Sequence, residues 1–122
     1  MKLHKFSVEF YETFSGDCPV GEFIKNQDVK MRAKIYRMLE LLEERGNTLR
    51  MPYSEHLDDG IFQLRTQVGN KITRILYFFI VDCKIIVTNG FAKKTQETPP
   101  AEIELAKRYR TEYFNRQEDK SK

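Results

Sequence analysis

The sequence contains little of several residue types that mark special classes of protein. Its 122 residues include no Trp, two Cys, four Pro and six Gly. So little Pro and Gly excludes a collagen-like or low-complexity chain, and no apolar run approaches the roughly 18 residues that cross a bilayer. Cys18 and Cys83 are far apart and lie outside any metal-ligand spacing, so we expect a reducing, cytoplasmic location and no membrane association.

The remaining composition is that of one globular domain. The chain is 40% hydrophobic and 32% charged, and its length is enough to bury a core without disulfide or metal crosslinks. The first residues, MKLHKFSVEFYE, reach acidic side chains too early to supply the apolar segment of a signal peptide. We expect a single domain over residues 1–118, followed by a frayed tail over residues 119–122.

The positive charge is concentrated in one part of the chain. The net charge is only +3, but residues 61–96 hold six lysines and arginines against one acidic residue, Asp82. The same stretch is the richest in strand-forming residues. A basic sheet in a weakly charged protein indicates an anionic partner, although solvated strand lysines would produce the same pattern.

The first half of the chain predicts a strand and two helices. Residues 4–13 alternate between apolar and polar side chains, which is typical of a half-buried strand. A short helix is expected to begin at Pro19. A longer amphipathic helix is expected from about residue 28 to 45, with Gly46 as its C-terminal stop. Its core-facing positions are Met31, Ile35, Met38 and Leu42.

The second half predicts a polar connection, three strands and a helix. The connection covers residues 47–60, the strands cover 61–68, 71–81 and 85–91, and the helix opens at Pro99-Pro100. The Gly69-Asn70 pair between the first two strands is typical of a two-residue hairpin loop. The predicted order is β-α-α-β-β-β-α, a small α+β domain with a mainly antiparallel sheet and helices packed on it.

The length of this hairpin loop sets the strand register. If the loop has two residues, Val68 faces Lys71 and Arg65 lies directly opposite Arg74, on the same face of the sheet. Like charges in a direct cross-strand pair are destabilising. A sequence selected only for stability has no reason to place two arginines there, so the pair indicates a binding site.

The next turn leaves two registers open. A two-residue turn at Asp82-Cys83 or Cys83-Lys84 sets Arg74 opposite Phe91 or Lys93, whereas a three-residue turn would break this parity. In the two-residue cases a basic row forms beside an aromatic ring. Its members are Arg65, Arg74, Lys93 and Phe91, with Gln63 on the same face. Two guanidiniums and an ammonium around a ring match a phosphodiester with a base to stack.

The row also has a purely structural interpretation, and the sequence lacks the motifs of several other chemistries. Each arginine would be purely structural if it paired with a carboxylate elsewhere, such as Glu9 or Asp59. The sequence has two histidines, His4 and His56, and no cluster with metal-ligand spacing. It has neither a Gly-rich phosphate loop nor a nucleophile elbow. An enzyme acting on phosphodiesters through this row is therefore expected to use no metal and no cofactor.

Several segments together resemble a known family. They are GIFQLR (60–65), RILYF (74–78), NGFAKKT (89–95), Pro99 and EIELA (102–106). In this order and spacing, the chain resembles the HigB-like, phage-derived branch of the RelE/ParE toxin superfamily, the toxin half of a bacterial toxin–antitoxin pair. The resemblance covers most of the chain, from the first strand to the last helix, and the predicted element order agrees with the RelE-like fold.

The resemblance implies an activity and partners. The expected activity is that of an mRNA interferase, an endoribonuclease that cuts codons on the translating ribosome, inhibits translation and arrests growth. The expected partner is a HigA-like antitoxin with a helix-turn-helix domain, through which alone the toxin would reach operator DNA. The implied mechanism is attack of the RNA 2′-hydroxyl on the adjacent phosphorus, which leaves a 2′,3′-cyclic phosphate.

The resemblance also implies roles for individual residues. The implied catalytic set is Arg65, Arg74, Lys93 and Lys94, and the implied RNA-binding set is Tyr53, His56, Gln63 and Phe91, with Tyr109 and Tyr113 as further candidates. The arginines would stabilise transition-state charge, and one of the two lysines would act as the base. Tyr53 or His56 would stack on a base or move a proton.

Two alternative functions keep the same fold. ParE-like relatives inhibit DNA gyrase and do not cut RNA. A non-catalytic RNA-binding module would hold RNA by phosphate contacts and by stacking on Phe91 alone. The basic row and the HigB-like segments favour RNA cleavage over both.

Overall fold

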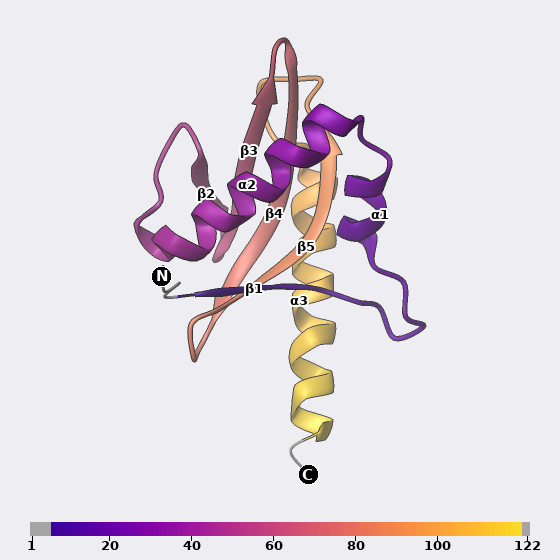
Figure 1. Ribbon diagram of the computed structural model, residues 1–122. Helices are drawn as coiled ribbons and strands as arrows, with labels where there is room; N and C mark the ends of the chain where they lie inside the picture. The colour runs from indigo at the N-terminus through magenta and orange to yellow at the C-terminus, as the bar shows by residue number, and fades with distance from the viewer. Residues whose placement is uncertain (1–5, 121–122) are drawn as a thin grey trace.

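The protein folds into a five-stranded mixed sheet with helices on both faces (Figure 1). The computed structural model describes residues 6–120. Its elements are β1 (Ser7–Phe10), α1 (Pro19–Lys25), α2 (Val29–Arg45), the 3₁₀ turn η1 (Gly46–Thr48), β2 (Ser54–Asp58), β3 (Ile61–Val68), β4 (Lys71–Ile80), β5 (Lys84–Ala92) and α3 (Pro100–Lys120). The strand order is β1-β5-β4-β3-β2, in which β1 and β5 are parallel and all other pairs are antiparallel. This confirms the predicted α+β class.

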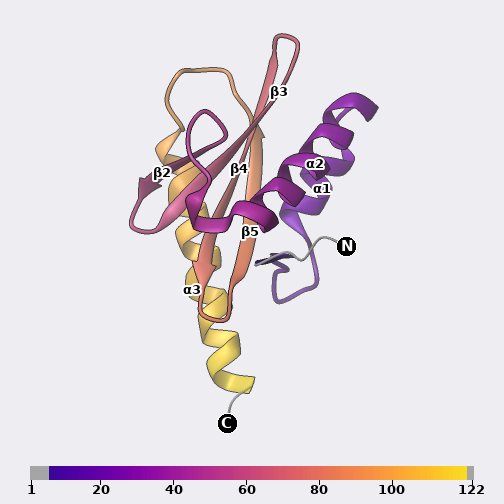
Figure 2. The ribbon, with the colours of Figure 1, turned by 60° about the vertical axis from the view of Figure 1, so that its left-hand side comes forward.

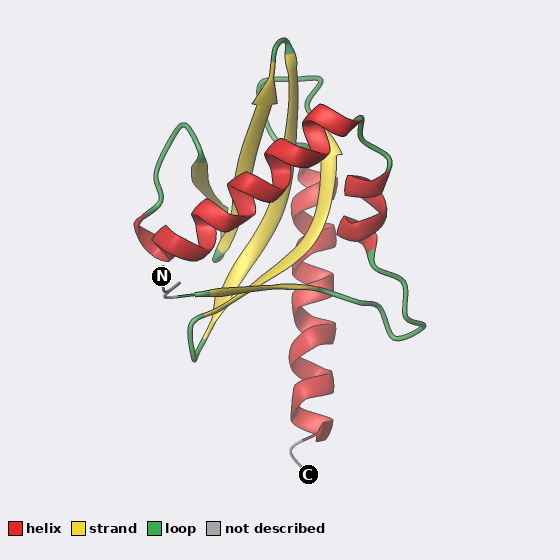
Figure 3. Cartoon of the chain, in the orientation of Figure 1, coloured by secondary structure: helices red, strands yellow, loops and turns green. Residues whose placement is uncertain are grey.

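The two faces of the sheet carry separate hydrophobic clusters. On one face, α1 and α2 pack over Leu64, Ile75 and Tyr77. On the other, α3 packs over Leu76 and Phe78. The turned view shows the sheet between these layers (Figure 2), and the cartoon shows the C-terminal end of α3 extending past the sheet (Figure 3). No helix within the described residues is long and apolar enough to cross a membrane.

Helix α2 forms as the periodicity predicts. The Asp28 carboxylate caps its N-terminus by accepting a hydrogen bond from the Met31 backbone N–H at 2.9 Å. The four expected core positions are all buried. The helix ends at Gly46, which has a φ of 53° and whose missing Cβ leaves space for the Phe6 ring. A local pattern thus sets both ends of α2.

The β3–β4 hairpin has the predicted register. Val68 pairs with Lys71, and Arg65 pairs with Arg74. Gly69 has a φ of 60°, as a tight hairpin loop with the twist of the strands requires. The two arginines therefore face one another across neighbouring strands.

The β4–β5 hairpin reaches a predicted register by a different route. Ile80 pairs with Lys84, so the turn has three residues, Val81–Cys83, and the two-residue turn was wrong. A β-bulge between Ile75 and Tyr77 then shifts the register by one residue. The shift restores the parity that the longer turn breaks, and Arg74 lies opposite Phe91.

Three predicted boundaries need correction. The supposed connection 47–60 contains strand β2, so the order is β-α-α-β-β-β-β-α; β2 is a polar edge strand without the apolar alternation by which strands are recognised. The first strand covers only Ser7–Phe10, and residues 4 and 5 of its predicted range lie outside the described residues. Helix α3 continues through residues 119 and 120 of the predicted tail, whereas residues 121 and 122 lie outside the described residues.

Gly90 allows α1 to lie close to β5. A Cβ at this position would be 2.6 Å from Cδ2 of Phe23, a side chain of α1. Real Cβ contacts of that length essentially do not occur, so the Phe23 ring can occupy this space only because residue 90 has no side chain. The Gly in the NGFAKKT segment thus has a packing role.

Candidate functional site

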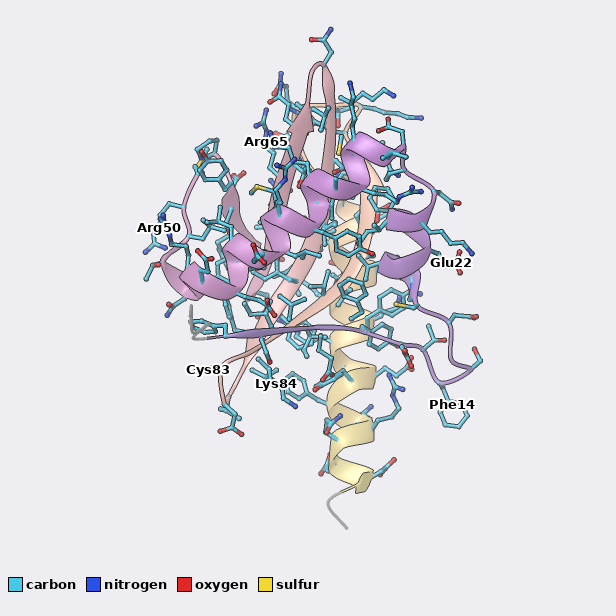
Figure 4. All side chains as sticks on the ribbon, viewed as in Figure 1. Phe14, Glu22, Arg50, Arg65, Cys83 and Lys84 are labelled. Carbon is cyan, nitrogen blue, oxygen red and sulfur yellow. The ribbon has the colours of Figure 1, made fainter. Side chains whose placement is uncertain are left out.

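The two arginines of the basic row line a pocket at the hairpin end of the sheet. The pocket has a volume of about 120 Å³ and is lined by Met51, Pro52, Tyr53, Ser54, Glu55, Gln63, Arg65 and Arg74. Arg65 stands on the half of β3 nearer the β3–β4 turn (Figure 4), and the loop between β5 and α3 lies at the same end of the molecule (Figure 1). Arg65 and Arg74 alternate with Leu64 and Ile75, which pack under α2, so the arginines project from the α3 face. Helix α3 starts beyond this loop and leaves the pocket open.

Arg74 is a nearly buried cation. Its side chain is 7% exposed, and Nη1 donates to Thr98 Oγ1 at 3.3 Å. Its Nε atom is buried without a hydrogen-bond partner among the described residues. Burial lowers the pKa of Arg74, the Glu55 carboxylate opposes that effect, and the charge of Arg65 adds to it. A guanidinium stays protonated even so. An anion bound in the pocket would offset the repulsion between Arg65 and Arg74.

Arg65 is held by its own hairpin. Its backbone N–H donates to the Tyr53 carbonyl at 2.8 Å, which joins β3 to the loop before β2. Its Nη2 donates to Gln67 Oε1 at 2.7 Å, and Gln67 in turn donates to the Gly69 carbonyl. The guanidinium is therefore oriented by a neutral amide.

The carboxylates proposed as structural partners lie elsewhere. Glu9 pairs with Lys84 at 3.9 Å. Asp59 pairs with Arg110 at 2.9 Å. The purely structural interpretation of the arginine row, in which Glu9 or Asp59 neutralises it, is therefore not supported by these contacts.

The pocket also contains residues that the sequence analysis missed. Glu55 accepts a hydrogen bond from Gln63 Nε2 at 3.0 Å, and Thr98 Oγ1 donates to Gln63 Oε1. Glu55 faces Gln63 in the β2–β3 pairing, so it would have been found had β2 been recognised. Thr98, from the loop between β5 and α3, gives no sequence signal that would connect it to the site.

Tyr53 and His56 have different positions. Tyr53 lines the pocket and is 48% exposed, so its ring is accessible to a ligand. His56 follows Glu55 on β2 and therefore projects from the opposite face. Its ring packs edge-to-face with that of Phe62, with the ring centroids 5.1 Å apart, and its Nε2 accepts a hydrogen bond from the Gly60 N–H. The structure does not bring His56 into the pocket.

Of the remaining predicted residues, Phe91 is nearest to Arg74 in register, and Lys93 lies two residues further along the chain. The backbone N–H of Lys93 donates to the Ile72 carbonyl at 2.9 Å, which continues the β4–β5 pairing and gives Lys93 the face of Arg74. Phe91 lies opposite Arg74 but packs against the α3-side core. Lys94 is exposed and lies in the loop after β5. Phe91 is therefore part of the wall under the row and not an open stacking platform.

The further tyrosine candidates belong to the core. Tyr109 stacks on Tyr11 with ring centroids 4.5 Å apart, and Tyr113, also on α3, is buried in the cluster between this helix and the sheet. Within residues 6–120, no group of three or more His, Cys, Asp or Glu side chains is arranged to hold a metal ion.

The fold and this site define a small RelE-like α+β domain with a cationic pocket on an open sheet face. A family model described as "Phage derived protein Gp49-like (DUF891)" matches residues 22–111, and the chain belongs to this family. The match begins within α1, ends within α3 and includes every residue of the pocket. The family is RelE-like and toxin-like, so the predicted toxin character is confirmed at that level. No match was found among the curated proteins.

Proposed function

We propose that this protein is the HigB-like toxin of a type II toxin–antitoxin pair and that it cleaves mRNA in its cationic pocket. The observation that carries the proposal is the juxtaposition of Arg65 and Arg74 with Glu55 in one pocket. Two cations beside a carboxylate provide what phosphodiester cleavage needs, because charge must be stabilised while a proton is removed.

The arginines would hold the scissile phosphate. Arg65 and Arg74 both line the pocket, so their two positive charges act on the same space. Charge on the nonbridging oxygens grows as the 2′-oxygen attacks phosphorus, so hydrogen bonds from guanidinium groups strengthen in the transition state. Low solvent exposure around Arg74 increases this effect.

Glu55 is the better candidate for the base than either lysine. A carboxylate accepts a proton directly, and Glu55 lines the pocket, whereas neither Lys93 nor Lys94 does. In the proposed step, Glu55 takes the 2′-hydroxyl proton, the 2′-oxygen bonds to phosphorus, and the bond from phosphorus to the 5′-oxygen breaks. The Lys93 ammonium supplies the proton to that leaving oxygen. The products are a 2′,3′-cyclic phosphate and a new 5′-hydroxyl end.

Tyr53 would contact the base beside the scissile phosphate. Its half-exposed ring borders the pocket next to Arg65, whose backbone it anchors. Stacking on an aromatic ring tolerates any base, which suits an enzyme that works on many messages. Membership of a toxin-like family makes an antitoxin the expected partner, and the HigB-like resemblance specifies a HigA-like protein with a helix-turn-helix domain.

The function is tested by inducible expression in a bacterium, with sequencing of RNA 5′-hydroxyl ends. Wild type is compared with Arg65→Ala/Arg74→Ala and with Arg108→Ala, which removes an exposed arginine of α3. New 5′-hydroxyl ends within translated frames are expected for wild type and Arg108→Ala and not for the double variant. The same assay on naked RNA and on translating ribosomes determines whether cleavage needs the ribosome.

Other outcomes point to the other functions. Growth arrest without RNA cleavage would favour gyrase inhibition, which a supercoiling assay with purified protein detects. Salt-sensitive RNA binding without new ends would indicate a binding module. Full toxicity of the double variant would rule out the proposed site.

A further inference from the structure

We propose that Thr98 and Gln63 are positioning residues that hold Arg74 and Glu55 in their active geometry through one directed hydrogen-bond relay. The relay runs from Arg74 Nη1 to Thr98 Oγ1 (3.3 Å), from Thr98 Oγ1 to Gln63 Oε1, and from Gln63 Nε2 to Glu55 Oε1 (3.0 Å). It connects the cation of the pocket to its carboxylate. The inference rests on the proposed cleavage of RNA in this pocket.

The direction of the relay follows from the chemistry of its ends. A guanidinium only donates hydrogen bonds, so Thr98 must accept from Arg74 and give its single proton to Gln63. The carbonyl oxygen of Gln63 accepts this hydrogen bond from Thr98, so the NH₂ group of the same amide is directed toward Glu55. An ionised carboxylate only accepts hydrogen bonds. Because one end of the relay can only donate and the other can only accept, the direction of every hydrogen bond in it is fixed. Its dipoles point from the positive end to the negative end and polarise one another.

Burial keeps water from replacing the relay. Thr98 is 9% exposed, Gln63 is 2% exposed and Arg74 is 7% exposed. Removing the Thr98 hydroxyl would leave Arg74 Nη1 and Gln63 Oε1 unpaired at once. Each would then turn toward another partner, because buried polar groups are rarely left unsatisfied.

The partners of Thr98 and Gln63 indicate a role in the site and not only in the core. Both side-chain bonds of Thr98 go to residues that line the pocket, and those of Gln63 go to Glu55 and Thr98. Thr98 precedes Pro99 and Pro100, where α3 begins. Thr98 lies in a loop that belongs to neither strand. Through it, the relay sets the distance between Glu55 on β2 and Arg74 on β4.

The expected signature is a loss of turnover with substrate binding retained. Thr98→Val keeps the shape of the side chain and removes the hydroxyl, so it should lower kcat by about 10- to 100-fold, since a small misplacement of reacting groups has effects of this size. KM should change much less, because Arg65 and Tyr53 keep their places. Thr98→Ser restores the hydroxyl and should return kcat to within about threefold of wild type.

The test measures cleavage rates of purified variants on translated RNA, with circular dichroism to verify folding. Thr111→Val is the matched control, because the Thr111 hydroxyl is exposed and donates to the Lys107 carbonyl of its own helix. Gln63→Met removes the middle of the relay with little change in shape and should have the same effect as Thr98→Val. If Thr98→Val does not fold, Gln63→Met is compared with wild type in its place.

The failures are distinguishable. No cleavage by wild type would overturn the proposed function, and this inference with it. Cleavage by wild type with an unchanged kcat in folded Thr98→Val or Gln63→Met would overturn the relay alone. Equal loss in Thr98→Ser and Thr98→Val would also overturn it, because packing and not the hydroxyl would then be responsible.

Discussion

Arg65 and Arg74 form a direct cross-strand pair in the antiparallel β3–β4 hairpin. Their charges repel, and the repulsion contributes to lowering the pKa of Arg74 below its ordinary value after burial, which is the larger cause. Like charges placed opposite one another destabilise a sheet. The arrangement therefore stores a local electrostatic cost that an anionic ligand would remove.

Replacing Arg65 should raise the stability of the fold and lower its cleavage activity. In Arg65→Gln, loss of the repulsion is expected to raise the free energy of unfolding by ~0.5 kcal/mol. Loss of one charge-stabilising donor is expected to slow RNA cleavage by about 100-fold or more. Urea denaturation and the 5′-hydroxyl assay measure the two effects, with Arg108→Gln as the control. A variant that is less stable than wild type would show that the cross-strand repulsion is already compensated.

Replacing Glu55 should separate catalysis from binding. Glu55→Gln keeps the shape of the side chain and removes the base, so cleavage is expected to fall by about 100-fold or more. RNA with a 2′-deoxy group at the cleavage position should still bind. Glu40→Gln on the exposed face of α2 is the control. Cleavage at the wild-type rate in Glu55→Gln would assign the base to Lys93 instead, and Lys93→Met would then be inactive.

Tyr77 should make the fold sensitive to alkaline pH. Burial raises the pKa of Tyr77 from 10.0 to about 12, and its hydrogen bond with Ser54 acts in the opposite direction. The unfolded phenol ionises first, so this contribution to stability is complete below pH 10 and is lost as pH rises toward about 12. Tyr77→Phe should flatten the decline in the free energy of unfolding over that range.

At neutral pH the same variant should lose ~1 kcal/mol, because Ser54 loses its buried partner. Urea denaturation at several pH values measures both effects. The buried tyrosines Tyr11 and Tyr113 also have raised pKa values, so some decline should remain. An unchanged slope in Tyr77→Phe would show that Tyr77 does not contribute to the alkaline decline.

Gly90 should tolerate no side chain while Phe23 is present. Gly90→Ala places a Cβ 2.6 Å from the Phe23 ring, and it is expected to lower the free energy of unfolding by ~1–3 kcal/mol through overpacking. Phe23→Leu in the same chain should recover part of the loss, whereas Phe23→Leu alone should be destabilising. Additive losses in the double variant would show that the two positions do not compete for the same space.

Local sequence patterns are sufficient to predict much of the fold without any tertiary contact. The 3.6-residue period, the Asp28 cap and Gly46 are sufficient for α2, since each acts within a turn of helix. The two-residue loop at Gly69-Asn70 is sufficient for the Arg65–Arg74 pair, because loop length sets hairpin register. The family resemblance extended this to the toxin-like class.

Tertiary structure decided the rest. Strand β2 exists only because β3 offers it hydrogen bonds, and its pairing brings Glu55 to Gln63. The bulge between β4 and β5 and the longer turn cancel in register, so Arg74 lies opposite Phe91, as predicted, although the predicted turn was wrong. Thr98 reaches the pocket across 24 residues of chain from Arg74. The sequence by itself determined the Arg65–Arg74 pair, because the register of a tight hairpin is local. Only folding could add the carboxylate of Glu55 and the hydroxyl of Thr98, because they come from segments that meet through the sheet.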